Sequence, residues 1–265
     1  MGSGRAAWDF LMHTREEAQA KGKELTDVVH LVISDIEMPE MDGHMRIELI
    51  TMWYNEEFLA PFFLQHYNYA DRINILYDTD TTDNTKKICE QYPNVRIIPF
   101  HFPNMMDDEI KRDLINDLYS KIDADWVLSV DSDEFAFLKE HNFFIYDFRN
   151  FLAADKKHDI YNVMLYQVYR HITDKDLDPD LPAVPQRRHG DPNISVGINA
   201  LYKKPILVRG NLSINWEPGC HSIRYGRDPR AVAPQHVLGA HWAMGTYSTL
   251  SILKFSLNRL TFSLL

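Results

Sequence analysis

The chain has 265 residues, 45% of them hydrophobic, and a formal net charge of −10 at pH 7. This length accommodates one α/β domain of ordinary size with a smaller additional piece, and the apolar content suffices for a full core. The acidic charge excludes a nucleic-acid partner, because the sequence offers no basic stripe that could neutralise phosphates.

The cysteines and the hydropathy pattern restrict the class of protein further. Cys89 and Cys220 lie far apart and lack a metal-ligand spacing, so we interpret them as reduced thiols. The sequence contains no apolar run long enough to span a bilayer and no secretory signal. We therefore expect a cytoplasmic protein, and peripheral attachment to the inner face of a membrane stays open.

From Arg46 onward, strand patterns alternate with helix patterns. Short apolar and β-branched runs predict strands at residues 47–52, 73–77, 95–98 and 126–130. Apolar residues at helical spacing predict a helix that begins near Asn55 and a second helix over residues 109–122. The buried face of the second helix would carry Ile110, Leu114, Leu118 and Ile122. This alternation implies right-handed crossovers, and the predicted fold class is α/β with a mainly parallel sheet and flanking helices.

The second half of the chain has a weaker pattern. We expect a helix over residues 144–151, a strand over 160–169, strands at 200–202 and 205–208, and a final helix over 250–260. Residues 174–193 are rich in Asp, Pro and Arg without periodicity, and they predict a long loop.

An acidic motif follows the strand predicted at 126–130. Asp131, Ser132, Asp133 and Glu134 leave the end of this buried strand, and open α/β sheets bind their ligands at that edge. Two carboxylates so close together repel each other, and a divalent cation with oxygen ligands would offset their charge. A nucleoside diphosphate is the ligand that such a cation would carry.

The first 45 residues differ from the rest. Residues 5–43, including the run from Leu31 to Gly43, resemble a fragment of a response-regulator receiver of a chemotaxis coupling protein. In that family the residue at Asp35 accepts the phosphoryl group, but the acidic metal-binding pair and the later Thr/Ser and Lys are missing here. Because the match ends before His44-Met45, a dipeptide encoded by a common cloning site, we interpret residues 1–45 as a leader introduced by cloning. The alternative is a natural fusion.

Residues 46–260 resemble a GT-A fold glycosyltransferase of the family 2-like group. The resemblance depends on the order of motifs: the first-strand signature at 52–57, an acidic loop at 78–85, Lys111-Arg112-Asp113, and the D-x-D motif at 131–133. In the C-terminal half the run at 204–208, His221, His241-Trp242 and Lys254 echo the spacing of the group. Asp113 departs from the Arg-Asn pair of the family. We therefore expect one GT-A domain over residues 46–265.

The resemblance implies a nucleotide site at the ends of the first two strands. Tyr54, Asn55 and Glu56 would flank the nucleotide base, and Asp78 would accept a hydrogen bond from it. Taken alone, Asn55-Glu56 also suits a plain helix start, where carboxylates are favoured.

Two cations are further candidates for the phosphates. Arg112 and Lys254 would contact them, although an exposed position is the ordinary one for both residue types.

The resemblance also implies Mn²⁺ or Mg²⁺ at the D-x-D motif. Asp133 is the expected direct ligand, Asp131 would bind the metal or the ribose, and His241 would add a nitrogen ligand or contact the diphosphate. A histidine in this apolar context can equally be a hydrogen-bonded core residue.

An inverting transfer needs a general base for the acceptor hydroxyl. Glu217, between Trp216 and Pro218, and Asp191, in the predicted loop, are the two candidates. For Glu134, next to the metal motif, we expect a packed and hydrogen-bonded supporting position.

The expected activity is a metal-dependent glycosyl transfer of the hexosyltransferase type, from a UDP- or GDP-type sugar donor to a glycan or lipid-linked acceptor. The resemblance places this activity in cell-surface polysaccharide or lipopolysaccharide synthesis. A sugar nucleotidyltransferase on the same fold is one alternative, but residues 54–57 are acidic and lack the glycines of a phosphate loop. A non-enzymatic signalling protein that uses the receiver fragment is the other.

Overall fold

The structure is a computed structural model that describes residues 45–103, 106–140, 143–145, 147–187, 189–191, 203–226, 231–232, 237–242 and 262–263. The chain divides into two units, Met1–His44 and Met45–Leu265, and all described residues belong to the second. The receiver-like fragment and the expected elements at 250–260 and 200–202 lie outside the described residues. The interpretation of residues 1–45 as a leader stays a prediction.

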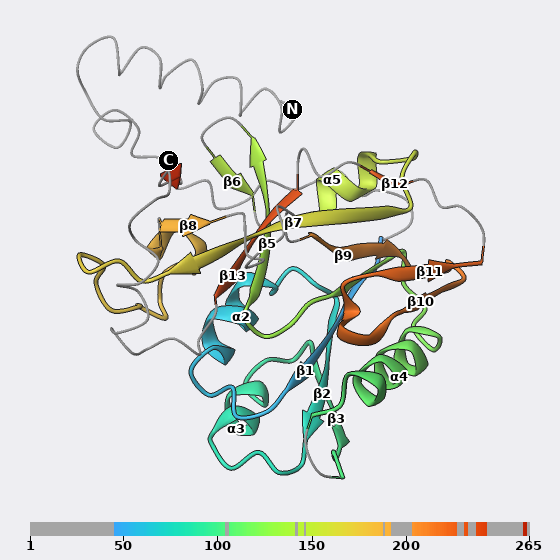
Figure 1. Ribbon diagram of the computed structural model, residues 1–265, viewed down its shortest axis with the longest axis horizontal. Helices are drawn as coiled ribbons and strands as arrows, with labels where there is room; N and C mark the ends of the chain where they lie inside the picture. Colours follow the sequence, from blue (N-terminus) through green and yellow to red (C-terminus); the bar gives the residue numbers. More distant parts are fainter. Residues whose placement is uncertain are drawn as a thin grey trace, which may run out of the picture. The chain divides into compact units, whose positions relative to one another are not determined.

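The described strands and helices alternate over the first half of the domain and give way to strands in the second (Figure 1). The strands are β1 (Ile47–Trp53), β2 (Arg72–Asp78), β3 (Val95–Phe100), β4 (Trp126–Ser129), β5 (Glu134–Glu140), β6 (Phe143–Ile145), β7 (Ile160–Tyr169), β8 (His189–Asp191), β9 (Lys203–Arg209), β10 (Ile214–Trp216), β11 (Ile223–Tyr225), β12 (Ala231–Val232), β13 (Val237–Trp242) and β14 (Phe262–Ser263). The helices are α2 (Ala60–His66), α3 (Thr85–Cys89), α4 (Asp108–Tyr119) and α5 (Arg149–Ala154), with 3-10 turns η2 (Val184–Gln186) and η3 (Pro218–Cys220).

The first four strands form a parallel unit in the order β3-β2-β1-β4. β1 and β4 are buried almost throughout, as expected for central strands that are covered on both faces. The helices that connect these strands lie outside the sheet (Figure 1). The predicted α/β fold class is confirmed, and so are the four strands expected in this half.

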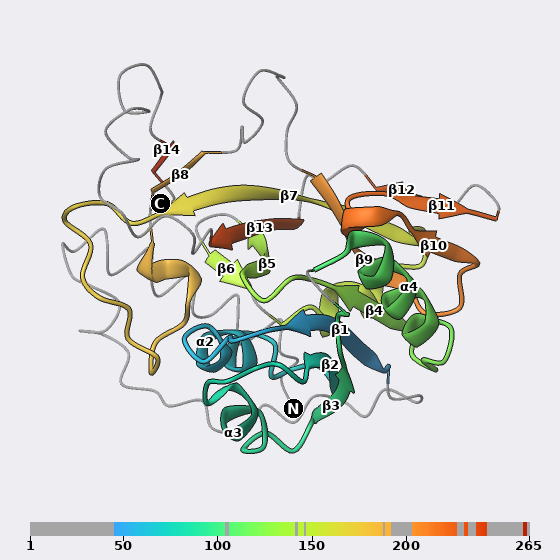
Figure 2. The same cartoon turned by 60° about the horizontal axis from the view of Figure 1, so that its bottom comes forward.

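The second half of the domain extends this sheet with strands of both directions. β9 pairs antiparallel with β4, and the ten-residue β7 pairs with β9 along its first half. β13 then runs parallel to β7, and β5 runs antiparallel to β13 (Figure 2). The carboxyl ends of β1, β2, β4, β7 and β13 therefore face one edge of the sheet, together with the amino ends of β5 and β9.

Apolar side chains pack on both faces of the sheet. One cluster joins Phe63 of α2 and Cys89 of α3 to residues of β1, β2 and β5. The other joins Ile115 and Leu118 of α4 to Trp216 of β10. The helices that precede and follow β2 therefore cover one face, and α4 with the β10–β11 hairpin covers the other. Cys89 and Cys220 are both free and buried, which agrees with the expected reduced thiols.

Two helix predictions need correction. The buried face of α4 consists of Lys111, Ile115, Leu118 and Tyr119, because a carboxylate at the end of β4 draws the lysine inward. The helix expected over residues 144–151 is instead β6 followed by α5, because residues 143–145 pair with β5. Pairing with the preceding strand thus overrides the local helical pattern.

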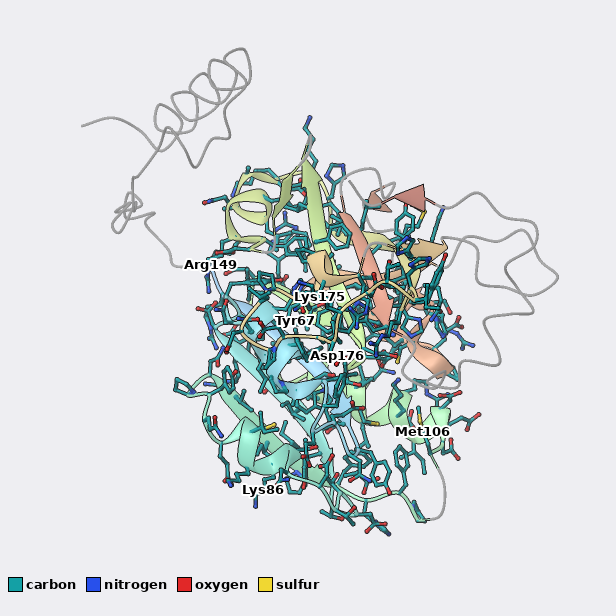
Figure 3. All side chains as sticks on the ribbon, turned by 90° about the vertical axis from the view of Figure 1, so that its left-hand side faces the viewer. Tyr67, Lys86, Met106, Arg149, Lys175 and Asp176 are labelled. Carbon is teal, nitrogen blue, oxygen red and sulfur yellow. The ribbon has the colours of Figure 1, made fainter. Side chains whose placement is uncertain are left out.

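The end of α2 fixes the beginning of β5. The Tyr67 hydroxyl donates to Glu134 O at 2.9 Å and accepts from Ala136 N at 2.9 Å. His66 Nε2 lies 2.7 Å from Ala136 O. Figure 3 shows Tyr67 in the interior and Lys86 at the margin of the molecule. These bonds fix the position of the start of β5, and of the turn that precedes it, relative to the end of α2.

Candidate active site

The turn between β4 and β5 carries the acidic motif. Glu134 N donates to Asp131 O at 3.1 Å, and Asp131 N donates to Glu134 Oε2 at 2.9 Å. This reciprocal pair closes the turn and presents Asp131, Ser132 and Asp133 at the carboxyl end of β4. The motif therefore lies at the ligand-binding edge of a parallel unit, as its sequence predicts.

Two lysines hold the carboxylate of Asp131. Lys111 Nζ of α4 lies 2.7 Å from Asp131 Oδ1, and Lys204 Nζ of β9 lies 2.7 Å from Asp131 Oδ2. Burial alone would raise the pKa of this carboxyl, but the two ammonium groups outweigh it and hold the pKa well below its ordinary value. Asp131 is therefore ionised, with a cation at each oxygen.

Lys204 also binds the second buried carboxylate of the motif. Its Nζ lies 3.0 and 2.9 Å from the two oxygens of Glu134, and both side chains are almost completely buried. Removal of one partner from such a pair leaves an uncompensated buried charge, which is costly. The packed and hydrogen-bonded position expected for Glu134 agrees with this arrangement.

Sequence reasoning missed both lysines as site residues. Each is a cation at a position where the local pattern expects an apolar side chain: Lys111 shares the helical spacing of Ile115 and Leu118, and Lys204 precedes the buried run at 205–208. A charged residue in register with a buried face needs a counter-charge, and the acidic motif is the obvious partner. That signal could have identified them.

Asp133 faces a histidine of β13. Its Oδ2 lies 3.1 Å from His241 Nε2, and its backbone carbonyl accepts from Trp242 N at 2.8 Å. Burial lowers the pKa of His241, but the hydrogen bond and the charge of Asp133 outweigh this effect and raise it above its ordinary value. The sheet therefore brings together two residues that are more than one hundred positions apart in the sequence.

Gln167 of β7 orients the histidine. His241 Nδ1 lies 3.0 Å from Gln167 Oε1. The other ring nitrogen, Nε2, is directed at Asp133, so each nitrogen of the imidazole has an oxygen partner. An outer hydrogen bond of this kind fixes the tautomer of metal-binding histidines in proteins.

Backbone pairing aligns four residues across neighbouring strands of this edge. Glu134 of β5 pairs with His241 of β13, His241 pairs with Gln167 of β7, and Gln167 pairs with Asp191 of β8. The register thus places the candidate base Asp191 two strands from His241.

The loop after β1 is connected to the loop after β2. Asn55 adopts a left-handed backbone conformation with φ of 53°, and its Oδ1 accepts from Thr82 N at 2.8 Å. Asparagine tolerates this conformation better than most residues with a side chain. Tyr54, directly before it, is exposed at this edge of the sheet. The hydrogen bond from Thr82 N to Asn55 thus connects the loop after β1 to the loop after β2.

Glu56 connects the first loop to the acidic motif. The Ser132 hydroxyl donates to Glu56 Oε1 at 2.7 Å, and Glu56 N donates to Thr85 Oγ1 at 2.7 Å. Burial, reinforced by the charges of Asp133 and Asp131, raises the pKa of Glu56 to about 7, although the bond from Ser132 opposes the rise. Near neutral pH this carboxyl is therefore close to half protonated.

Asp78 lies buried at the end of β2. Its Oδ1 accepts from Asp80 N at 3.0 Å, which closes a turn. Asp78, Asp80 and His101 also form a cluster whose possible ligand atoms all lie within 4.8 Å of one another. In the described part of the chain this cluster is a second place where a cation could bind, and it is separate in sequence from the D-x-D motif.

The remaining candidates have other partners in the structure. Arg112 pairs with the neighbouring Asp113 at 2.8 Å. Glu217 accepts hydrogen bonds from Ser222 Oγ and Arg224 Nε, and these two bonds lower its pKa. Lys254 lies outside the described residues. The predicted roles of these three residues therefore stay predictions.

The donor set at Asp133 and His241 fits a divalent cation. One carboxylate oxygen and one imidazole nitrogen already face each other, and the contact with Gln167 orients the ring so that Nε2 points to Asp133. Mn²⁺ accepts this nitrogen together with oxygen ligands. Two protein ligands leave several positions for water or phosphate oxygens, as is usual for ions that act on nucleotides.

Comparison with known proteins gives a partial likeness only. No known family matches the sequence, and no curated protein matches it. Among solved structures, TarS of S. aureus shares 17% identity over 73% of this chain and 36% of that chain, with a TM-score of 0.44. TarS 1–349 in complex with UDP-GlcNAc gives 14% identity, 74% and 58% coverage, and a TM-score of 0.44.

A second solved enzyme is more distant. Glucosyl-3-phosphoglycerate synthase from Mycobacterium tuberculosis, in complex with Mn²⁺, UDP and phosphoglyceric acid, shares 13% identity over 46% of this chain and 43% of that chain, with a TM-score of 0.32. The chain therefore spans less than two thirds of the length of these proteins. Across the described residues, no helix has the length and apolar character that a bilayer span requires.

Proposed function

We propose that the chain is a metal-dependent glycosyltransferase that uses a UDP- or GDP-type sugar donor. The observation that carries this proposal is the arrangement of Asp133, His241 and Gln167 at the carboxyl end of the sheet. It places a carboxylate opposite an imidazole beside Asp131, which two lysines bind. This edge suits the binding of a diphosphate with Mn²⁺ or Mg²⁺.

The nucleotide would lie across the ends of β1 and β2. Tyr54 offers an exposed ring on which a base can stack, and Asp78 presents a carboxylate that can accept from a base N–H. Asn55 and Glu56 hold the loop between these two groups and the acidic motif. Arg112 and Lys254 stay candidates for phosphate contacts.

The bound cation would supply positive charge to the leaving diphosphate. Asp133 and His241 would hold it, and Lys204 and Lys111 would keep Asp131 ionised and in place. In this way the residues of the chain would help to stabilise the negative charge that develops on the diphosphate as the bond between sugar and phosphate breaks.

Asp191 is the better candidate for the general base. Its strand pairs with Gln167, next to His241, whereas Glu217 is bound to Arg224 and Ser222 and has a lowered pKa. A carboxylate with a lowered pKa is a weaker proton acceptor. We propose that Asp191 takes the proton of the acceptor hydroxyl in an inverting transfer.

The acceptor in this proposal is a glycan or lipid-linked molecule of cell-surface polysaccharide or lipopolysaccharide synthesis. The reaction would take place in the cytoplasm, at the inner face of the membrane. These finer assignments come from the sequence resemblance. The alternative of a sugar nucleotidyltransferase is less favoured because the loop after β1 is acidic and fixed by Asn55 and Glu56.

Release of the nucleoside diphosphate from UDP- and GDP-sugars in the presence of Mn²⁺ tests the proposed function. The chain should release UDP or GDP from at least one donor, and Asp133→Ala should reduce the rate at least a hundredfold because a metal ligand is lost. Asp123→Ala, which removes a fully exposed carboxylate, is the matched control and should leave the rate unchanged. Equal rates for Asp133→Ala and the unaltered chain would refute the proposed role of the metal.

A further inference from the structure

Lys111 and Lys204 leave little negative charge for a free cation at the acidic motif. The two lysines lie opposite two carboxylates, Asp131 and Glu134, at distances of 2.7 to 3.0 Å. Two positive and two negative charges cancel within this group. The remaining carboxylate of the motif, Asp133, lies opposite His241.

Both carboxylate oxygens of Asp131 already have hydrogen-bond donors. Each of its carboxylate oxygens accepts a short hydrogen bond from an ammonium group, one from a helix and one from a strand. A cation that approached these oxygens would have to displace a lysine or lie beside it. At such separations two like charges repel strongly, because the site is partly removed from water.

Free Mn²⁺ or Mg²⁺ would therefore find one carboxylate and one imidazole. These ions prefer several oxygen ligands, and Mg²⁺ in particular is usually bound through one or two carboxylates together with substrate phosphates. A diphosphate would supply both the missing oxygens and the negative charge that the two lysines remove from the motif. Its oxygens would also attract the two ammonium groups.

We propose that Lys111 and Lys204 make cation binding at Asp133 and His241 dependent on the nucleoside diphosphate. The lysines act as positioning residues: they neutralise Asp131, so the site accepts the cation together with the diphosphate and binds the free cation weakly. This inference rests on the proposed function, since it concerns the same donor site.

Calorimetric titration of the full chain tests the dependence directly. Three titrations are needed: MnCl₂ alone, UDP alone, and MnCl₂ in the presence of saturating UDP, each also with GDP in place of UDP. The expected result is an affinity for Mn²⁺ that rises at least about tenfold when a nucleotide is present, equivalent to about 1.4 kcal/mol. Equal Mn²⁺ affinity with and without nucleotide would overturn the inference and leave the proposed function intact.

A variant with one lysine removed gives an effect of opposite sign on the two ligands. Lys111→Met keeps an unbranched side chain, one heavy atom shorter, and removes the charge at Asp131 Oδ1. It should bind Mn²⁺ alone about tenfold more tightly and nucleotide more weakly, because Asp131 regains charge that attracts the metal and repels the diphosphate. Weaker binding of Mn²⁺ alone by a folded Lys111→Met would contradict the inference.

Lys121→Met is the matched control. Lys121 directly follows the same helix, and its exposed side chain pairs with Asp117 and not with the acidic motif. It should change neither titration. Thermal unfolding of each variant reports whether it is folded. If Lys111→Met does not fold, the three titrations of the unaltered chain still test whether Mn²⁺ binding depends on the nucleotide. Absence of binding for every combination of Mn²⁺, UDP and GDP would overturn both this inference and the proposed function.

Discussion

At the scale of single residues, burial and pairing set the chemistry of the candidate site. Asp131 is ionised because two lysines hold it, and His241 has a raised pKa because it faces Asp133. Glu56 has a raised pKa because burial outweighs the bond from Ser132. The same rule operates outside the site at His66, which is buried below β5.

His66 should make the stability of the protein depend on pH. Burial lowers its pKa from 6.5 to about 4, so the unfolded chain binds a proton at higher pH than the folded chain does. The stabilising contribution is complete above pH 6.5 and is lost as the pH falls through 4, a loss on the order of 3 kcal/mol.

The variant His66→Gln, which keeps an amide donor for Ala136 O, isolates this contribution. Urea unfolding of both proteins between pH 4 and pH 7 is the measurement, over the range set by the two pKa values. The difference in free energy of unfolding between them should shrink as the pH falls. A difference that is constant across this range would show that His66 does not titrate as described.

Part of the candidate site could be predicted from residue types and from their order in the sequence. The acidic motif, Asn55, Asp78 and His241 could be predicted because their residue types and order carry the resemblance, and the structure places them at one edge of the sheet. For Lys111 and Lys204 the local pattern shows only a cation in register with a buried face, and it does not show which carboxylate each one meets. Their burial depends on carboxylates that are distant in sequence and become neighbours only when α4 and β9 pack beside β4.

At the scale of elements, two short connections position the site. The left-handed turn at Asn55 joins the loop after β1 to Thr82. Gly210, at the end of β9, approaches the backbone of Ala124 so closely that a Cβ atom would lie 1.7 Å from its carbonyl oxygen. β9 can therefore lie beside β4, and carry Lys204 to Asp131, only with glycine at this point.

Substitution of Asn55 should separate backbone conformation from hydrogen bonding. Asn55→Gly loses the bond to Thr82 N but accepts the φ of 53°, whereas Asn55→Ala loses the bond and is also strained. The alanine variant should be less stable than the glycine variant by about 1 kcal/mol in chemical denaturation. Equal stability of the two variants would mean that the left-handed conformation of Asn55 carries no strain.

Gly210→Ala should destabilise the domain by about 3 kcal/mol, because the carbonyl oxygen of Ala124 cannot move aside without displacing backbone. Gly226→Ala is the matched control: its Cβ would lie 3.0 Å from Ser213 Oγ, the end of a side chain that can rotate. The control should lose less than about 1 kcal/mol. Thermal unfolding of both variants is the measurement, and a loss at Gly210 no larger than that at Gly226 would contradict the described approach.

The four strands of the first half were predictable, and so were β7 and β9, which match the strands predicted at 160–169 and 205–208, whereas β5 and β13 were not predicted. β1, β2 and β4 are mostly buried, and burial on both faces produces an apolar run whatever the partner strand. β5 and β13 include Glu134, Gly239 and His241, which interrupt a strand pattern. They pair with each other, and β13 also pairs with β7; a local sequence pattern does not reveal these contacts.

At the scale of the whole molecule, the sheet collects the ends of strands from both halves at one edge. The parallel strands contribute the groups expected for the nucleotide, and β13, β7 and β8 contribute His241, Gln167 and Asp191. In the proposed function these two groups of strands form a donor side and an acceptor side, joined at the turn from Asp131 to Glu134. The account therefore requires that the cation bind at this junction and not at the cluster of Asp78, Asp80 and His101.

Anomalous diffraction from crystals grown with Mn²⁺ and UDP tests this requirement most directly. The account expects an anomalous peak about 2.1 to 2.2 Å from both Asp133 Oδ2 and His241 Nε2, distances typical of metal–ligand bonds, with the diphosphate completing the coordination. A peak between Asp78, Asp80 and His101 with none at Asp133 would contradict it.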